Sequence, residues 1–105
     1  MKSRLQKLSK VLIMMDELPW KHALYLAGSF PWTENTLCAV LDPNETDDPD
    51  EVPDFAKQNE LKYALSVHEV QGIVANAKQQ LGKVAMPRLI EAFNFYYKND
   101  AFIEF

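Results

Sequence analysis

The chain has 105 residues, 48% of them hydrophobic, which suits one folded domain with a modest core and excludes a largely disordered chain. Its net charge of −4 argues against binding to the phosphate backbone of nucleic acid and favours a basic protein or a cation as partner. Cys38 is the only cysteine, so an internal disulfide cannot form, and a reducing cytoplasm is the expected compartment.

The N-terminal residues loosely imitate a secretion signal, because four bases precede the apolar run VLIMM. That run has only five residues, and Asp16 and Glu17 follow it directly. It is too short for the apolar part of a signal peptide or for a membrane span. We therefore expect a soluble cytoplasmic protein that does not enter the membrane.

A helix of about four turns is the first predicted element. Ser3 is its expected N-cap, and Pro19 ends it near Leu18 because a residue before proline avoids the α region. Its apolar stripe recurs every three or four residues and consists of Leu5, Leu8, Leu12 and Met15.

Two strands follow, predicted at about residues 23–26 and 36–42. Gly28 ends the first, and Asp42 with Pro43 ends the second. The connection contains a turn built on Pro31. The strands are close enough in the sequence to pair as an antiparallel hairpin.

The stretch from Asp42 to Asp54 holds seven acids, three prolines and no Lys or Arg. Proline at this density excludes a helix interior and a central strand, so we expect a loop. Two interpretations remain open: a solvated connector, or a surface that steers a basic partner towards the domain. A short helix with Pro53 at its first position is expected next.

The second half of the chain predicts a strand at residues 61–67, in which Leu61, Tyr63, Leu65 and Val67 share one face. Ser66 and Glu69 have the spacing of a capping box, which starts a helix that ends at Gly82. Gly72, inside this helix, indicates close packing there.

A third helix begins near Pro87 and carries Leu89, Ile90, Phe93, Tyr96 and Tyr97 on its apolar side. The closing segment AFIEF predicts an edge strand. The order of elements neither repeats nor alternates strictly. We therefore predict an α+β fold, a single domain over residues 1–105 with a small, mostly antiparallel sheet packed by about three helices.

Catalytic chemistry is weakly represented. A nucleophilic mechanism would use Cys38 with His22 or His68 as the base, but a thiol in an apolar strand is usually a buried hydrophobe with a raised pKa. These three residues also lack the short spacings of zinc sites, and no glycine-rich phosphate loop is present. We expect neither enzymatic activity nor a cofactor.

Calcium is the natural cation for an acidic loop. When Asp42 is placed first in the EF-hand register, Asp47 stands where glycine is needed and Pro53 where the final glutamate belongs. A dedicated metal site is therefore not expected.

The two tryptophans each follow a proline where the chain changes direction: Trp20 after Pro19, and Trp32 after Pro31. Large aromatic residues commonly close the core of a small domain. Tryptophan is also enriched among the residues that dominate protein interfaces. Both interpretations stay open.

The segments PWKHALYL, CAVLDPNETDDPDEVPDFA, YALSVHEVQGIVANA and FNFYYKNDAFIEF together resemble a family of small bacterial domains with no assigned function. This resemblance covers the chain from about Leu18 onward. It implies a compact, cytoplasmic bacterial domain and names no catalytic residues. In general type, the chain is also similar to the immunity proteins of bacterial toxin systems, including those of contact-dependent growth inhibition.

The resulting hypothesis is an immunity protein that occludes a cognate toxin with a basic surface. The residues expected to bind this partner are Asp47, Asp48, Asp50, Glu51 and Asp54, with Trp20 or Trp32 as an apolar anchor. Three alternatives remain: a regulatory or adaptor domain, a small enzyme that uses Cys38, and self-association through the terminal segment. The sequence does not indicate the oligomeric state.

Overall fold

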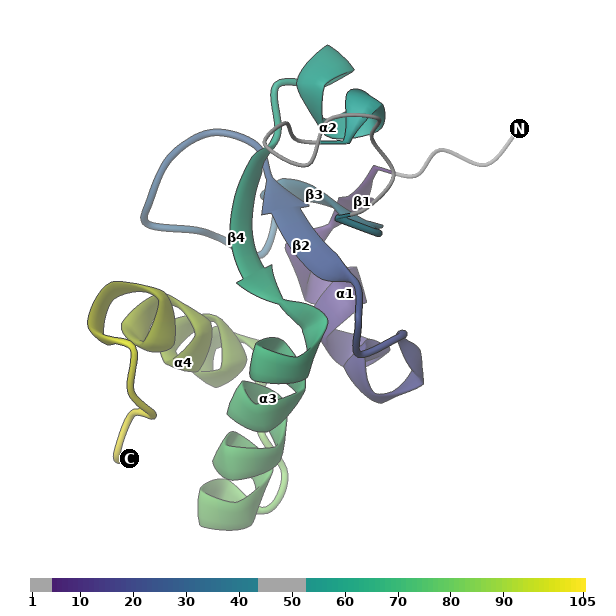
Figure 1. The fold of residues 1–105 in the computed structure, drawn as a ribbon. Helices are drawn as coiled ribbons and strands as arrows, with labels where there is room; N and C mark the ends of the chain where they lie inside the picture. The colour runs from purple at the N-terminus through teal and green to yellow at the C-terminus, as the bar shows by residue number, and fades with distance from the viewer. Residues whose placement is uncertain (1–4, 44–52) are drawn as a thin grey trace.

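The computed structural model describes residues 5–43 and 53–105. The elements, in chain order, are β1 (Gln6–Lys7), α1 (Leu8–Ile13), the 3₁₀ helix η1 (Met15–Glu17), β2 (Ala23–Leu26), β3 (Leu37–Leu41), α2 (Asp54–Gln58), β4 (Lys62–Ser66), α3 (Val67–Leu81) and α4 (Met86–Asn99) (Figure 1).

The strands form one antiparallel sheet in the order β1-β3-β2-β4. In the central pair, Ala23 lies opposite Leu41 and Leu26 lies opposite Cys38, which confirms the predicted hairpin. The α+β fold class is also confirmed. Because β1 has two residues and β4 is irregular, the well-formed part of the sheet is narrow.

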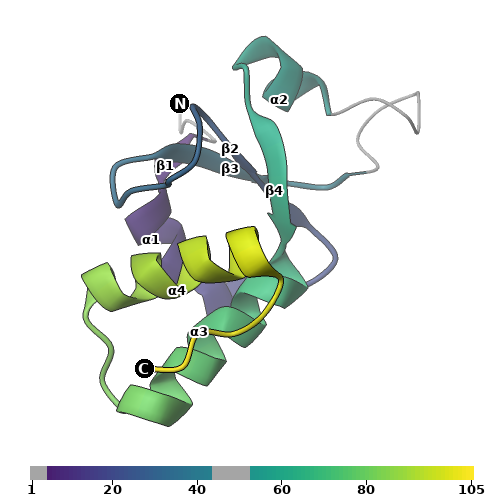
Figure 2. The ribbon, with the colours of Figure 1, turned by 90° about the vertical axis from the view of Figure 1, so that its left-hand side faces the viewer.

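Each face of the sheet carries its own apolar cluster. Strand residues alternate between the faces, so Leu24 and Leu26 point towards α1, α3 and α4, whereas Ala23 and Tyr25 point the other way. Helix α2 covers part of that second face, at the opposite end of the molecule from α3 and α4 (Figures 1 and 2). The larger cluster therefore lies between the sheet and the three other helices.

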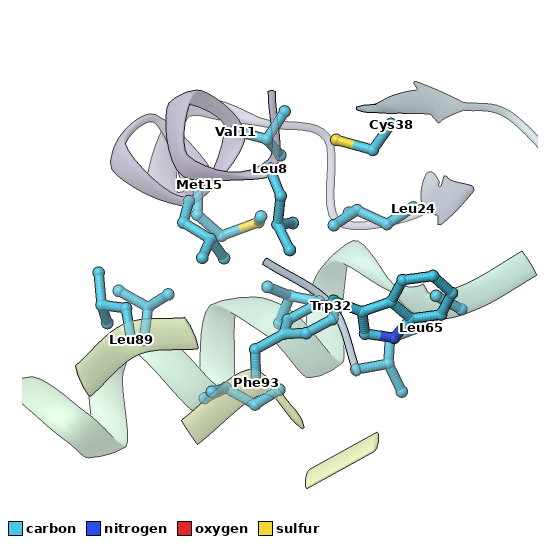
Figure 3. Close-up of a cluster of buried hydrophobic side chains, with 14 of the residues drawn as sticks. Leu8, Val11, Met15, Leu24, Trp32, Cys38, Leu65, Leu89 and Phe93 are labelled. Carbon is cyan, nitrogen blue, oxygen red and sulfur yellow. The ribbon is translucent and has the colours of Figure 1, made fainter. Parts of the chain in front are cut away.

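Phe93 is fully buried in this larger cluster. Figure 3 shows side chains from α1, the sheet, α4 and the β2–β3 connection meeting there. The labelled members are Leu8, Val11, Met15, Leu24, Trp32, Cys38, Leu65, Leu89 and Phe93.

The prediction of a four-turn first helix is wrong in its length. Gln6 and Lys7 pair with β3 instead, and the Leu8 N–H donates to the Thr36 carbonyl at 2.8 Å. The helix therefore begins at Leu8, without a side-chain cap, and tightens into η1 after Ile13. Ser3, the expected N-cap, lies outside the described residues. A tertiary pairing thus outweighs local helical periodicity here.

The predicted alternation over residues 61–67 is interrupted by a β-bulge. Leu24 pairs with Leu65 and Tyr25 pairs with Tyr63, which leaves Ala64 as the extra residue. After the bulge, Leu65 faces the helices instead of sharing a face with Tyr63. Val67 is already the first residue of α3.

Strand β4 runs into α3 without a connecting loop, since Ser66 ends the strand and caps the helix. The predicted capping box is confirmed: the Glu69 N–H donates to the Ser66 hydroxyl at 3.1 Å, and the Ser66 N–H donates to the Glu69 carboxylate at 3.2 Å. Gly82 ends α3 with a φ of 73°, as expected for a glycine stop.

Replacing Ser66 with alanine is expected to lower the free energy of unfolding by about 1 kcal/mol, because the cap that it provides to the first turn of α3 is lost. Urea unfolding followed by far-UV circular dichroism measures this change. Ser29→Ala, at an exposed position, is the matched control and should be neutral. Equal stabilities of the two variants would show that the cap contributes nothing.

Two further predictions need correction. Pro53 is the N-cap of α2 and not its first helical residue. The segment AFIEF does not form an edge strand: residues 101–105 follow α4 as a tail that packs on the helices. Strand pairing needs a free neighbouring strand edge, and this segment meets a helical side chain instead.

Candidate functional site

The structure describes only three of the seven residues that the sequence nominates for partner binding: Trp20, Trp32 and Asp54. Asp47, Asp48, Asp50 and Glu51 lie outside the described residues, and Asp54 is the first residue of α2. In chain order, the acidic stretch stands between β3 and α2, and α2 lies at the end of the molecule opposite α3 and α4 (Figure 1).

The two tryptophans have opposite environments. Trp32 is 5% exposed, and its ring packs edge-to-face on Tyr97 with centroids 5.6 Å apart. The backbone N–H of Trp32 donates to the Asn94 side-chain oxygen at 2.9 Å, and the Asn94 side-chain amide donates back to the Trp32 backbone carbonyl at 2.8 Å. Trp32 is therefore a core residue that fixes the β2–β3 connection to α4, and it is not available as an exposed anchor.

Trp20 is 59% exposed, on the turn between η1 and β2. Its ring packs edge-to-face on His68 with centroids 6.0 Å apart, and the Lys21 Nζ lies 5.5 Å from its centre. It is thus the tryptophan that a partner can reach.

Beside Trp20 lies a hollow of about 510 Å³, here called the acid–aromatic cleft. Its lining combines carboxylates and an imidazole with two aromatic rings: Asp16, His68, Glu69, Gln71, Gly72, Ala75, Tyr96 and Phe102. Element η1, the N-terminal half of α3, the end of α4 and the tail meet here. Residues that are far apart in the sequence therefore form one concave surface.

Glu69 organises one wall of the cleft. Besides closing the capping box, its carboxylate accepts hydrogen bonds from the Ser66 hydroxyl at 3.0 Å and from the Tyr96 hydroxyl at 3.3 Å. Burial, the negative charges of Glu69 and Asp100 and the hydrogen bond to Glu69 raise the pKa of Tyr96. The phenol therefore stays protonated at neutral pH and ties α4 to the start of α3.

Gln71 holds the opposite wall. Its side-chain amide donates to the carbonyls of Met15 and Leu18, each at 3.1 Å. These bonds fasten η1 to α3 immediately before the turn that carries Trp20. The exposed tryptophan therefore projects from a braced segment.

The chain matches the model of a family described as a domain of unknown function, DUF7716, over residues 5–105. It belongs to this family. Comparison with curated proteins and with solved structures finds no match. The family membership agrees with the resemblance to a domain family without assigned function, lends no support to the likeness to immunity proteins, and assigns no activity to the cleft.

The other candidate residues do not converge on a site. Cys38 is fully buried in β3, and burial raises the pKa of its thiol to about 12, so it is a poor thiolate nucleophile. His22 is half-buried, and its backbone carbonyl accepts a hydrogen bond from the Val67 N–H. Within residues 5–43 and 53–105 no cluster of three or more His, Cys, Asp or Glu side chains is arranged to hold a metal.

The distribution of charge distinguishes the cleft from the acidic stretch. Seven of the fifteen acids lie between Asp42 and Asp54, so the eleven bases outnumber the acids in the rest of the chain. Near the cleft, the Lys78 Nζ lies 3.8 Å from the Asp16 Oδ2, and both side chains are largely exposed. The cleft thus supplies acceptors at close range, whereas any long-range negative field must come from the acidic stretch.

No helix of the described part of the chain is both long and apolar enough to cross a bilayer.

Sequence reasoning missed the cleft although it named several of its residues. Ser66 and Glu69 were visible as a helix cap, and Tyr96 as part of an apolar face. Nothing in their spacing brings Asp16 or Phe102 to the same place, because those contacts depend on how η1 and the tail fold back onto α3.

Proposed function

We propose that this domain acts by binding another protein, and that its partner is a bacterial toxin that it neutralises by direct occlusion. The observation that carries the proposal is the exposed Trp20 beside the acid–aromatic cleft. The energetically dominant part of an interface usually combines an aromatic side chain, which loses its contact with water on binding, with neighbouring polar groups.

The cleft chemistry favours a cationic side chain of the partner. Asp16 and Glu69 offer carboxylate oxygens, while Tyr96 and Phe102 offer aromatic surface. A guanidinium or ammonium group gains from both, through charge-assisted hydrogen bonds and through cation–π contact. A Lys or Arg inserted into the cleft therefore suits its lining, while apolar partner surface packs on Trp20.

The acidic stretch supports the same choice of partner through its charge. Asp47, Asp48, Asp50, Glu51 and Asp54 concentrate negative charge in a few residues. Such a field accelerates the encounter with a basic protein and adds specificity. Trp32 takes no part in the proposed interface, because its side chain is buried.

Photo-crosslinking in the native host tests the proposal. A benzophenone amino acid replaces Trp20, and the captured protein is identified; the matched control carries the same group at Tyr63, which is also exposed but lies on β4. We expect a basic protein to be captured at position 20 and not at position 63. Expression of that protein alone should arrest growth, and co-expression of this domain should restore it.

Purified variants then locate the interface. Glu69→Gln and Trp20→Ala should each weaken binding of the captured protein, by about tenfold or more if they belong to the centre of the interface. Neutralising the five acids together should slow association and flatten its dependence on salt. A harmless captured protein would instead support the adaptor alternative, and unchanged binding by all three variants would exclude the proposed surface.

A further inference from the structure

The C-terminal tail, residues 101–105, runs back from α4 over α3 (Figure 2). The surface that it covers is here called the groove and includes Gly72, Gln80, Leu81 and Tyr96. It leaves the end of α4, crosses α3 at Gly72 and reaches Gln80, about two helical turns further along α3. Phe102 forms part of the acid–aromatic cleft on one side of the tail. Ile103 and Phe105 border a second hollow of about 420 Å³ on the other.

The tail backbone forms hydrogen bonds like those that an extended peptide forms with a neighbouring strand. The Gln80 amide donates to the Ile103 carbonyl at 2.8 Å and accepts from the Phe105 N–H at 2.9 Å. A single side chain thus satisfies a carbonyl and an N–H two residues apart, which is the pattern that a neighbouring strand would satisfy. The groove therefore binds the backbone of the tail as well as its side chains.

Three side chains of the tail fit distinct places. The Phe102 ring lies over Gly72, where an added Cβ would come within 3.4 Å of it, and packs on Tyr96 with centroids 5.4 Å apart. Ile103 packs against the main core, and Phe105 lies near Leu81. The glycine that the sequence marked for close packing is the place where the tail crosses the helix.

The tail is nevertheless held only in part. Phe102 remains 46% exposed and Phe105 40% exposed. The hinge residue, Asp100, has a φ of 53°, a left-handed conformation that residues other than glycine rarely adopt, and its N–H donates to the Tyr96 carbonyl at 2.7 Å. Straightening this residue would relieve the left-handed conformation and swing the tail away from its own groove.

We propose that the groove is a binding site for an extended apolar segment, and that its external occupant is the tail of a second copy of this chain, exchanged reciprocally. The second copy is the partner of known fit, because it carries the same Phe102, Ile103 and Phe105 that already match the groove. Reciprocal exchange recreates both groove contacts in each protomer and alters only the hinge. The dimer is thus governed by the conformation of Asp100.

A matched pair of full-length hinge variants tests the exchange. Asp100→Pro cannot adopt a positive φ and lacks the N–H that closes the hinge, so it should favour the dimer. Asp100→Gly accepts a positive φ freely and should favour the monomer. Light scattering after size exclusion, over a series of concentrations, measures the dimer dissociation constant of each variant. The constant should be lower for Asp100→Pro than for Asp100→Gly by about tenfold or more.

The groove variant Gln80→Ala, added to Asp100→Pro, should return the protein to the monomer, because the backbone of the exchanged tail loses both hydrogen bonds. Far-UV circular dichroism verifies that each variant is folded. A monomeric, folded Asp100→Pro would overturn the exchange. A dimer that Gln80→Ala does not weaken would also overturn it, since another surface would then be responsible.

A peptide assay decides the matter should Asp100→Pro fail to fold. A fluorescent peptide with the sequence of residues 100–105 is titrated into the full-length double variant F102A/F105A, whose own tail fits poorly. It should bind this variant more tightly than it binds the wild type, in which the tail competes from within the same chain. Absence of saturable binding to F102A/F105A, or binding that survives Gln80→Ala, would overturn the proposal.

Discussion

Replacing Trp32 with alanine is expected to destabilise the domain by about 3–5 kcal/mol, whereas the same change at Trp20 should cost about 1 kcal/mol or less. Trp32 is buried against Tyr97 in the main cluster, and its removal leaves a cavity that rigid neighbours cannot fill. Trp20 is mostly exposed, and its ring forms an edge-to-face pair with His68. The two variants thus separate the structural tryptophan from the accessible one.

Urea unfolding followed by far-UV circular dichroism measures both variants with a probe that does not depend on tryptophan. Because a domain of this size is stable by about 5–15 kcal/mol, Trp32→Ala could be partly unfolded in water. Trp32→Phe is the milder control: it keeps an aromatic ring and removes the buried Nε1, which has no hydrogen-bond partner among the described residues. Equal losses for Trp32→Ala and Trp20→Ala would contradict the assignment of Trp32 to the core.

Alkaline pH is expected to destabilise the domain steeply through Cys38. Burial raises the pKa of the folded thiol from 9.0 to about 12, and the folded state therefore holds the proton more tightly than the unfolded state. The stability that the protonated, buried thiol contributes is fully present below pH 9 and is lost as the pH rises from 9 towards 12. At about 1.4 kcal/mol per pH unit, the loss approaches about 4 kcal/mol at the upper end.

Cys38→Ala removes this titration and should delay the loss of stability to above about pH 10, where tyrosines ionise. Burial raises the pKa values of Tyr25, Tyr63 and Tyr96 too, so their contributions decline only at higher pH. Urea unfolding at intervals between pH 8 and pH 11 compares the two proteins. Parallel curves for wild type and Cys38→Ala would show that the thiol is not held protonated by burial.

Local signals in the sequence predicted those features whose energetics are local. The Ser66–Glu69 cap and the stop at Gly82 depend on residues only a few positions apart, and the β2–β3 hairpin joins two strands that are neighbours in the sequence; all three are present. The α+β class followed from the same signals taken in order. Proline density likewise predicted a loop after β3, most of which lies outside the described residues.

Features that depend on distant pairing were beyond the sequence. The bulge at Ala64 shifts which face Leu65 occupies, and nothing in the alternating pattern marks the residue at which the shift occurs. Gln6 and Lys7 join β3 because that strand offers an edge, although their own periodicity favours a helix. The terminal segment has the composition of a strand but meets Gln80 of a helix.

The acidic stretch and the tryptophans show the difference between what the sequence determines by itself and what depends on the tertiary structure. The sequence alone determined that seven acids and three prolines stand together, since charge and the missing proline N–H are properties of the residues themselves. Only the tertiary structure decided that Trp32 is buried and Trp20 exposed, although each follows a proline in a turn. The reason is that burial depends on what α3 and α4 bring against a side chain, and those contacts span the whole length of the domain.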